Sequence, residues 1–241
     1  MATRTVSSSP RAGSVWRSTP LLKVAMAISG LVLILFLLAH MYGNLKVFEG
    51  QDAFDSYSHH LRELGEPILP YGGALWIIRV VLLAAIVVHA VSAIILWRRA
   101  RRATGGKGGA RYASSKAPRG AQRSYASFTL RWGGVTIALF VIYHLLHLTT
   151  NTIAPGGASD SPYERVVNGF SIWWVVLSYT IALIALAFHL RHGIWAAMAT
   201  LGANTSPKRR KNLNIVAVVV AAVIVVGFLI PPYAVLLGLV G

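Results

Sequence analysis

The sequence predicts an all-α protein that crosses a membrane five times. Of its 241 residues, 55% are hydrophobic and only 12% are charged, against roughly 25% charged residues in an average soluble domain. The apolar residues gather into five stretches, each long enough to cross a hydrocarbon core of about 30 Å as a helix. These stretches cover residues 21–42, 73–97, 128–149, 170–198 and 213–239.

The segments that flank these stretches alternate between basic and acidic. Lys and Arg dominate the segment before the first stretch and the second and fourth connections, whereas all 7 Asp and Glu residues lie in the first and third connections. Because Lys and Arg accumulate on cytoplasmic loops, the N-terminus is predicted to be cytoplasmic and the C-terminus to lie outside. Membrane topology therefore accounts for the net charge of +16, and no nucleic-acid partner is expected.

Two units follow from this pattern. Residues 1–20 form a basic cytoplasmic arm, and residues 21–241 form the membrane domain. Within that domain, residues 98–125 are predicted to be a basic cytoplasmic loop. Its central part, residues 104–122, is rich in Gly and Ser, which is typical of a flexible linker. We expect this linker to contact anionic lipid or to dock a soluble partner.

The acidic first connection, residues 50–70, is predicted to contain an amphipathic helix along the outer interface. Phe54, Tyr57, Leu61 and Leu64 recur there at helical spacing.

Histidine is the polar residue that marks the interior of the predicted spans. The chain has no cysteine, which excludes disulfides, thiolate zinc sites, iron–sulfur clusters and cysteine nucleophiles, and the spans contain no Asp or Glu. The histidines within spans are His40 in the first, His89 in the second, His144 and His147 in the third, and His189 and His192 in the fourth. Because successive helices run in opposite directions, His40 and His144 share the outer level, and His89 and His189 share the inner level.

Two imidazoles at each of two levels suit two haem b groups, each with one axial ligand on either side. Zinc would need four ligands close together. Small residues that would let a porphyrin approach a helix are Gly30, Ala39, Ala85, Ala93, Gly133 and Gly134. Arg79 in the second span and Arg131 at the inner mouth of the third are candidates for the propionates, or they extend to the membrane interface.

Other interpretations of these histidines stay open. A histidine within a span can make a helix–helix hydrogen bond, and a row of histidines can relay protons in a transporter or channel without haem. His147 and His192 each lie one turn beyond a proposed ligand. Each could substitute as a ligand, but we expect them to support a ligand or to lie near the interface. His59 and His60, in the outer connection, are expected to be solvated.

The order and spacing of these motifs resemble one family, the cytochrome b membrane-anchor subunit of succinate dehydrogenase and fumarate reductase in its five-helix, two-haem form. The resemblance covers about residues 20–240. It rests on His40-Met-Tyr-Gly-Asn44, on Val88-His89-Ala90-Val91, on Arg131-Trp-Gly-Gly ahead of His144, and on Phe188-His189-Leu-Arg-His-Gly-Ile-Trp195 followed by Ser206-Pro207-Lys208-Arg209. The long basic segments, residues 1–20 and 98–125, go beyond the family pattern.

The resemblance implies that His40 and His144 bind an outer haem, and that His89 and His189 bind an inner haem. This pairing agrees with the one derived from depth. The resemblance also implies a multi-pass subunit of the bacterial cytoplasmic membrane that anchors a flavoprotein and an iron–sulfur protein on its cytoplasmic face. Electrons from succinate would then pass through the inner and outer haems to a quinone, commonly menaquinone.

The quinone site and the partner enzyme are the least determined parts of this hypothesis. Glu66 and Tyr71, just before the second span, are candidates for the quinone site on the outer side, and Ser18 is the candidate on the cytoplasmic side. A di-haem anchor of another dehydrogenase, such as a hydrogenase or formate dehydrogenase, is the alternative within the electron-transfer class.

Overall fold

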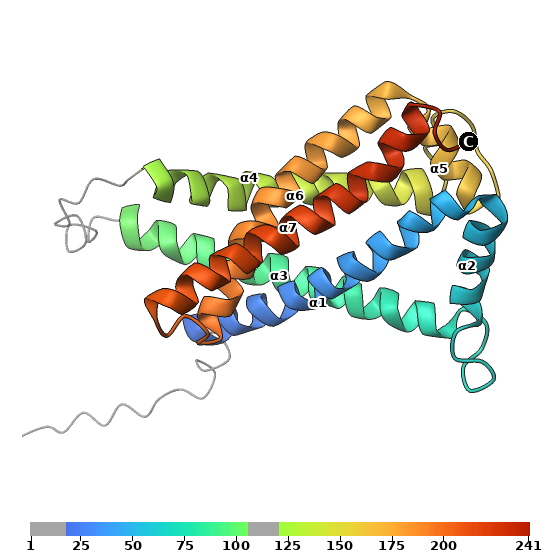
Figure 1. Cartoon of the computed structure of the whole chain (residues 1–241). Coiled ribbons are helices and arrows are strands. Elements are labelled where there is room, and N and C mark those ends of the chain that lie inside the picture. The colour runs from blue at the N-terminus through green and yellow to red at the C-terminus, as the bar shows by residue number, and fades with distance from the viewer. Residues whose placement is uncertain (1–17, 106–120) are drawn as a thin grey trace, which may run out of the picture.

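The computed structural model describes residues 18–105 and 121–241, and over these ranges it contains helices and no strands (Figure 1). Among the described residues, five helices are long and apolar enough to cross a membrane. They are α1 (Thr19–Leu45), α3 (Gly73–Gly105), α4 (Ala121–His144), α6 (Trp173–Thr200) and α7 (Pro207–Leu236). The predicted class, an all-α protein with five membrane-spanning helices, is confirmed.

Serine caps followed by proline set where α1 and α7 begin. The Ser18 hydroxyl accepts a hydrogen bond from the Leu21 amide, and the Ser206 hydroxyl accepts one from the Arg209 amide. Proline in the first turn needs no N–H partner there, so a Ser-Pro or Ser-Thr-Pro sequence starts a helix well. For this reason α7 begins before the predicted residue 213 and includes Lys208–Lys211 in its first turns.

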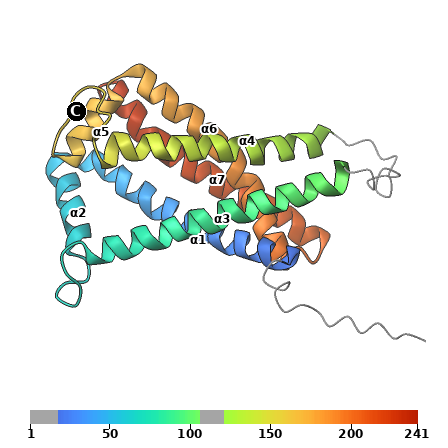
Figure 2. The ribbon, with the colours of Figure 1, turned by 180° about the vertical axis from the view of Figure 1, so that it is seen from behind.

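The predicted basic loop is narrower in the structure. Helix α3 continues through Arg98 and Arg102 to Gly105, and α4 begins at Ala121. Residues 106–120 of the predicted linker and residues 1–17 of the predicted arm lie outside the described residues. The Arg99 guanidinium donates to the Thr19 hydroxyl (2.9 Å), which joins the end of α3 to the start of α1. We call the end of the bundle where α1 begins and α3 ends the basic end (Figures 1 and 2).

Two short helices close the opposite end (Figure 1). Helix α2 (Gln51–Glu63) is the predicted amphipathic helix, and it buries Phe54. Helix α5 (Pro162–Phe170) was not predicted, because its polar first turn resembles a loop and its last residue was assigned to the fourth span. Asp55 joins the two helices, since its carboxylate accepts hydrogen bonds from the Ser161 hydroxyl and from the Tyr163 amide (3.0 Å).

The third span does not end as a regular α-helix. Residues Leu145–Thr149 form a π-helical turn, in which the Thr150 amide donates to the Leu145 carbonyl (2.9 Å). Such turns are rare and often occur at functional sites. This one begins directly after His144 and contains His147.

Buried side chains concentrate where α6 packs on α7. One cluster contains Val175, Val176 and Val235, and a second contains Ile194 and Ile224. Helix α1 packs against α3, α6 and α7, and α4 packs against α6. The outward faces of the long helices carry exposed Leu, Ile and Val, as expected of a surface that contacts lipid rather than water.

We expect Asp55→Ala to loosen the end of the bundle formed by α2 and α5. The variant leaves the Ser161 hydroxyl and the Tyr163 amide without their acceptor, which typically lowers the free energy of unfolding by about 1–3 kcal/mol. Thermal unfolding of the purified chain in detergent would measure this. Asp52→Ala, which changes an exposed carboxylate on the same helix, is the control, and an equal effect of both variants would contradict the role of Asp55.

Candidate functional site

Four histidines from four long helices meet as two pairs. The ring centroids of His40 on α1 and His144 on α4 lie 5.8 Å apart, with an angle of 88° between the ring planes. Those of His89 on α3 and His189 on α6 lie 6.1 Å apart, at 59°. A metal–imidazole bond is about 2 Å long, so two imidazoles on opposite sides of one metal have centroids about 6 Å apart. Both spacings therefore suit one metal atom between each pair of rings.

The helices that carry facing histidines are not packed closely on one another. In the part of the chain that the structure describes, neither α1 with α4 nor α3 with α6 is among the closely packed helix pairs. The four helices are held instead by contacts of α1 with α3 and α6, and of α4 with α6. Across these two helix pairs, the imidazole rings come within 5.8 Å and 6.1 Å of each other, measured between their centroids.

The His89–His189 pair has one ring nitrogen fixed by the backbone. Nδ1 of His89 lies 3.1 Å from the carbonyl oxygen of Met26 on α1, so this nitrogen carries the proton and donates it. Nε2 is then left with a lone pair for a metal. Gly30, one turn further along α1, lets the ring approach, because a Cβ there would lie 3.3 Å from Cε1 of His89. Nδ1 of His189 is buried without a partner in the described residues.

The His40–His144 pair is enclosed by aromatic rings. His40 lies between Phe36 (5.2 Å between centroids) and Phe228 (5.7 Å). Nδ1 of His144 lies 3.2 Å from the hydroxyl oxygen of Tyr179 on α6. As in His89, Nδ1 of His144 is engaged, and Nε2 is the nitrogen left for a metal.

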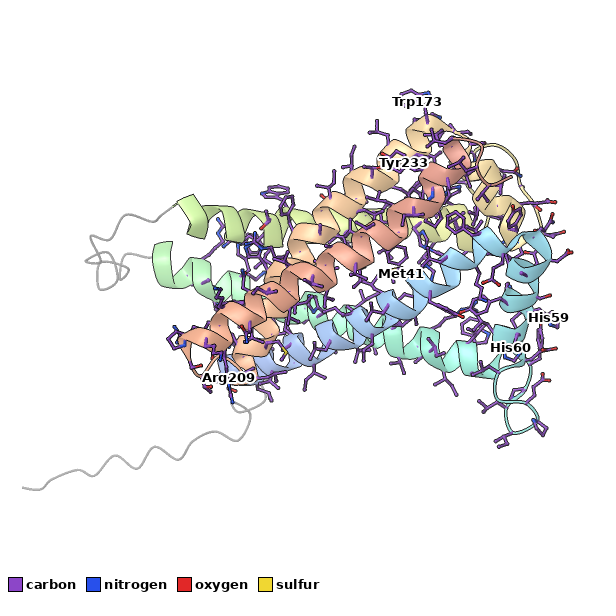
Figure 3. All side chains as sticks on the ribbon, in the orientation of Figure 1. Met41, His59, His60, Trp173, Arg209 and Tyr233 are labelled. Carbon is purple, nitrogen blue, oxygen red and sulfur yellow. The ribbon has the colours of Figure 1, made fainter. Side chains whose placement is uncertain are left out.

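The remaining histidines do not join either pair. His147 is buried, and its Nδ1 lies 2.9 Å from the Tyr179 hydroxyl. Nδ1 of His192 donates to the Phe188 carbonyl of its own helix (3.1 Å). His59 and His60 are 62% and 72% exposed and lie on α2 at the end of the bundle (Figure 3). The described residues contain no group of three or more His, Cys, Asp or Glu that could hold a metal ion.

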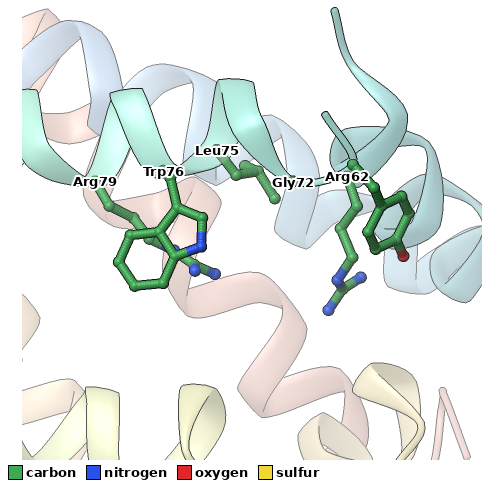
Figure 4. A pocket seen from close by; sticks show the side chains of 6 residues that line it. Arg62, Gly72, Leu75, Trp76 and Arg79 are labelled. Carbon is green, nitrogen blue, oxygen red and sulfur yellow. The ribbon is translucent and has the colours of Figure 1, made fainter. Parts of the chain in front are cut away.

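An apolar cavity of about 580 Å³ lies beside His40, between α1, α2 and α3. Its walls include Val32, Phe36, Ile78 and Leu82. A smaller cavity of about 190 Å³ follows at the start of α3, lined by Arg62, Tyr71, Gly72, Leu75, Trp76 and Arg79 (Figure 4). Arg62 and Leu75 line both cavities, so an apolar space beside a histidine leads to two guanidinium groups.

Residues 113–228 match the family model of the succinate dehydrogenase/fumarate reductase transmembrane subunit. Over these residues the chain is similar to this family. The match spans just under half of the chain and includes His144 and His189, whereas His40 and His89 precede it. Searches of curated proteins and of solved structures gave no significant match. The family inferred from the histidine motifs is confirmed, and the chain is a multi-pass membrane subunit of a redox enzyme complex.

The two arginines that the sequence singled out lie at different places in this transmembrane subunit. The Arg79 guanidinium lies over the Trp76 ring (5.0 Å) and lines the smaller cavity. The Arg131 guanidinium lies over the Trp97 ring (5.7 Å), near the basic end. Sequence reasoning missed Arg62, which is held on α2 by hydrogen bonds to the Ser58 carbonyl (2.7 Å) and hydroxyl (2.8 Å). Its place beside Arg79 depends on how α2 packs on α3, which no local motif encodes.

The three quinone candidates are not brought together. Tyr71 lines the smaller cavity, whereas Glu66 is exposed in the turn before α3 and is absent from the cavity walls. Ser18 lies at the basic end, where its hydroxyl caps α1.

Proposed function

We propose that this transmembrane subunit is a di-haem b anchor of a succinate dehydrogenase, which passes electrons from an iron–sulfur subunit to a quinone. The observation that carries the proposal is the pair of facing imidazoles found twice, at 5.8 Å and 6.1 Å, on four different helices. Family membership supports the enzyme class. Haem iron supplies one-electron redox chemistry when it is bound.

The residues present fit two haem groups. His40 and His144 would hold the outer one, and His89 and His189 the inner one. The Met26 carbonyl and the Tyr179 hydroxyl orient His89 and His144 through their Nδ1 atoms. Hydrogen bonds of this kind fix the tautomer of a metal-binding imidazole and raise its donor strength.

The spacing of the two pairs along the bundle supports a path across the membrane. His89 bonds to Met26 and approaches Gly30 on α1, whereas His40 lies further along the same helix. At 1.5 Å per residue, the two levels are separated by about 15–20 Å along α1.

The charged ends of the bundle support the proposed orientation in the membrane and the proposed docking of the partner subunits. With the basic end in the cytoplasm, as the positive-inside rule requires, a flavoprotein and an iron–sulfur subunit would dock there, closer to His89 than to His40. At the opposite end Arg79 and Arg62 line the cavity that continues from His40, where they would neutralise the outer propionates. Arg131 would serve the inner ones.

We place quinone reduction, with menaquinone as the quinone, beside Tyr71 at the end of the bundle opposite the basic end. Of the three candidates, Tyr71 lines the smaller of the two cavities described above, and its hydroxyl could exchange a proton with a quinone oxygen. A transporter or channel without haem remains the alternative from another class. The facing histidines favour the haem protein. A proton relay is disfavoured because no acidic residue lies within the predicted spans to continue it.

Haem quantification on single histidine variants tests the proposal. We expect the purified wild-type chain to hold two haem b groups. His40→Ala or His144→Ala should remove one, and His89→Ala or His189→Ala should remove the other, as seen in reduced-minus-oxidised spectra. His192→Ala is the control and should keep both, because its ring bonds to its own helix. A colourless wild-type chain would favour the transporter.

Gly30→Val should remove the inner haem selectively. The added methyl groups would meet the His89 ring, which a Cβ alone already approaches to 3.3 Å. We expect one haem per chain and an unchanged outer signal. Leu35→Phe, which enlarges a side chain that is 67% exposed on the same helix, is the matched control. Retention of both haems in Gly30→Val would show that the approach of α1 to His89 is not required.

A further inference from the structure

A single buried hydroxyl links His144 to a histidine outside both pairs. The Tyr179 hydroxyl oxygen lies 3.2 Å from Nδ1 of His144 and 2.9 Å from Nδ1 of His147. Tyr179 is 5% exposed and His147 is 2% exposed, so water does not compete for these bonds. The three side chains come from α6, from the end of α4 and from the π-helical turn.

The proton positions in this chain of hydrogen bonds follow from the role of His144. If Nε2 of His144 binds a metal, its remaining proton is on Nδ1 and is donated to the Tyr179 oxygen. The tyrosine hydroxyl has one proton, which it must then donate to the other neighbour. Nδ1 of His147 therefore accepts, and the order is His144 to Tyr179 to His147.

The surroundings hold Tyr179 and His147 in this geometry. The Tyr179 ring lies edge-to-face against Phe140 and Phe170, each 4.8 Å away between centroids. The His147 ring stacks on Tyr143 (5.6 Å, 25°) and covers Gly169, where a Cβ would overlap it. The π-helical turn directs the His147 ring toward α5 and α6, whereas the His144 ring faces His40.

Packing alone does not explain a histidine at residue 147. Its Nε2 is buried without a partner in the described part of the chain, which is unfavourable. A phenylalanine would fill the same niche without that cost. What the imidazole adds is an acceptor for the hydroxyl of Tyr179.

We propose that Tyr179 and His147 are positioning residues for the outer haem. Tyr179 accepts the Nδ1 proton of His144 and so fixes the ring with Nε2 toward the iron, and His147 fixes the Tyr179 hydroxyl. This inference rests on the proposed function. It adds two residues that bind no iron themselves but that determine how strongly His144 binds it.

Tyr179→Phe removes the hydroxyl and keeps the ring. Loss of such a partner typically weakens metal binding about 10–100-fold, so haem titration of the full-length apo-chain in detergent should show that loss at the outer site. The outer low-spin signal in electron paramagnetic resonance should shift, and the inner signal should stay. Tyr143→Phe is the matched control, because its ring touches His147 and Tyr179 while its hydroxyl bonds to neither histidine.

Variants of His147 separate positioning from packing. His147→Leu should shift the outer signal, and His147→Asn should restore it, because the Asn side-chain oxygen can accept where Nδ1 did. Unchanged affinity and signal in Tyr179→Phe, or equal effects of His147→Leu and His147→Asn, would overturn the inference. A wild-type chain that binds no haem would instead overturn the proposed function, so the two failures are distinguishable.

Discussion

A buried imidazole nitrogen needs a hydrogen-bond partner within a bilayer, and the protein supplies one for Nδ1 of His89 and of His144. For His89 and His144, one nitrogen bonds to the protein and the other is left on a ring that faces a second histidine. In the proposed haem sites, the iron between the rings would be the partner of that remaining nitrogen. The separation of α1 from α4 and of α3 from α6 is the structural counterpart of that need.

Two helices connect the pairs into one unit. Helix α1 carries His40 and also supplies the Met26 carbonyl that orients His89. Helix α6 carries His189 and also supplies the Tyr179 hydroxyl that bonds to His144. Each histidine pair is therefore held in part by a helix that carries a histidine of the other pair. A shift of α1 or α6 would disturb both pairs together, which suits the two redox groups that we propose.

Much of this architecture can be predicted from the sequence, because the bilayer restricts the choices. Twenty apolar residues in lipid must be helical, and the alternation of helix direction converts the positions of His40, His89, His144 and His189 into depths. Features that depend on tertiary contacts were missed. Helix α5 is amphipathic and short, the π-helical turn has no local signal, and Arg62 and Tyr179 acquire their places only when α2 packs on α3 and α6 packs on α4.

We propose that two iron porphyrins are each held between imidazoles of different helices. The haem content of the purified chain tests this, combined with near-infrared magnetic circular dichroism, which identifies the axial ligands. We expect two low-spin haem b groups per chain, both with two histidine ligands. A single haem, or a methionine or lysine as an axial ligand, would contradict it.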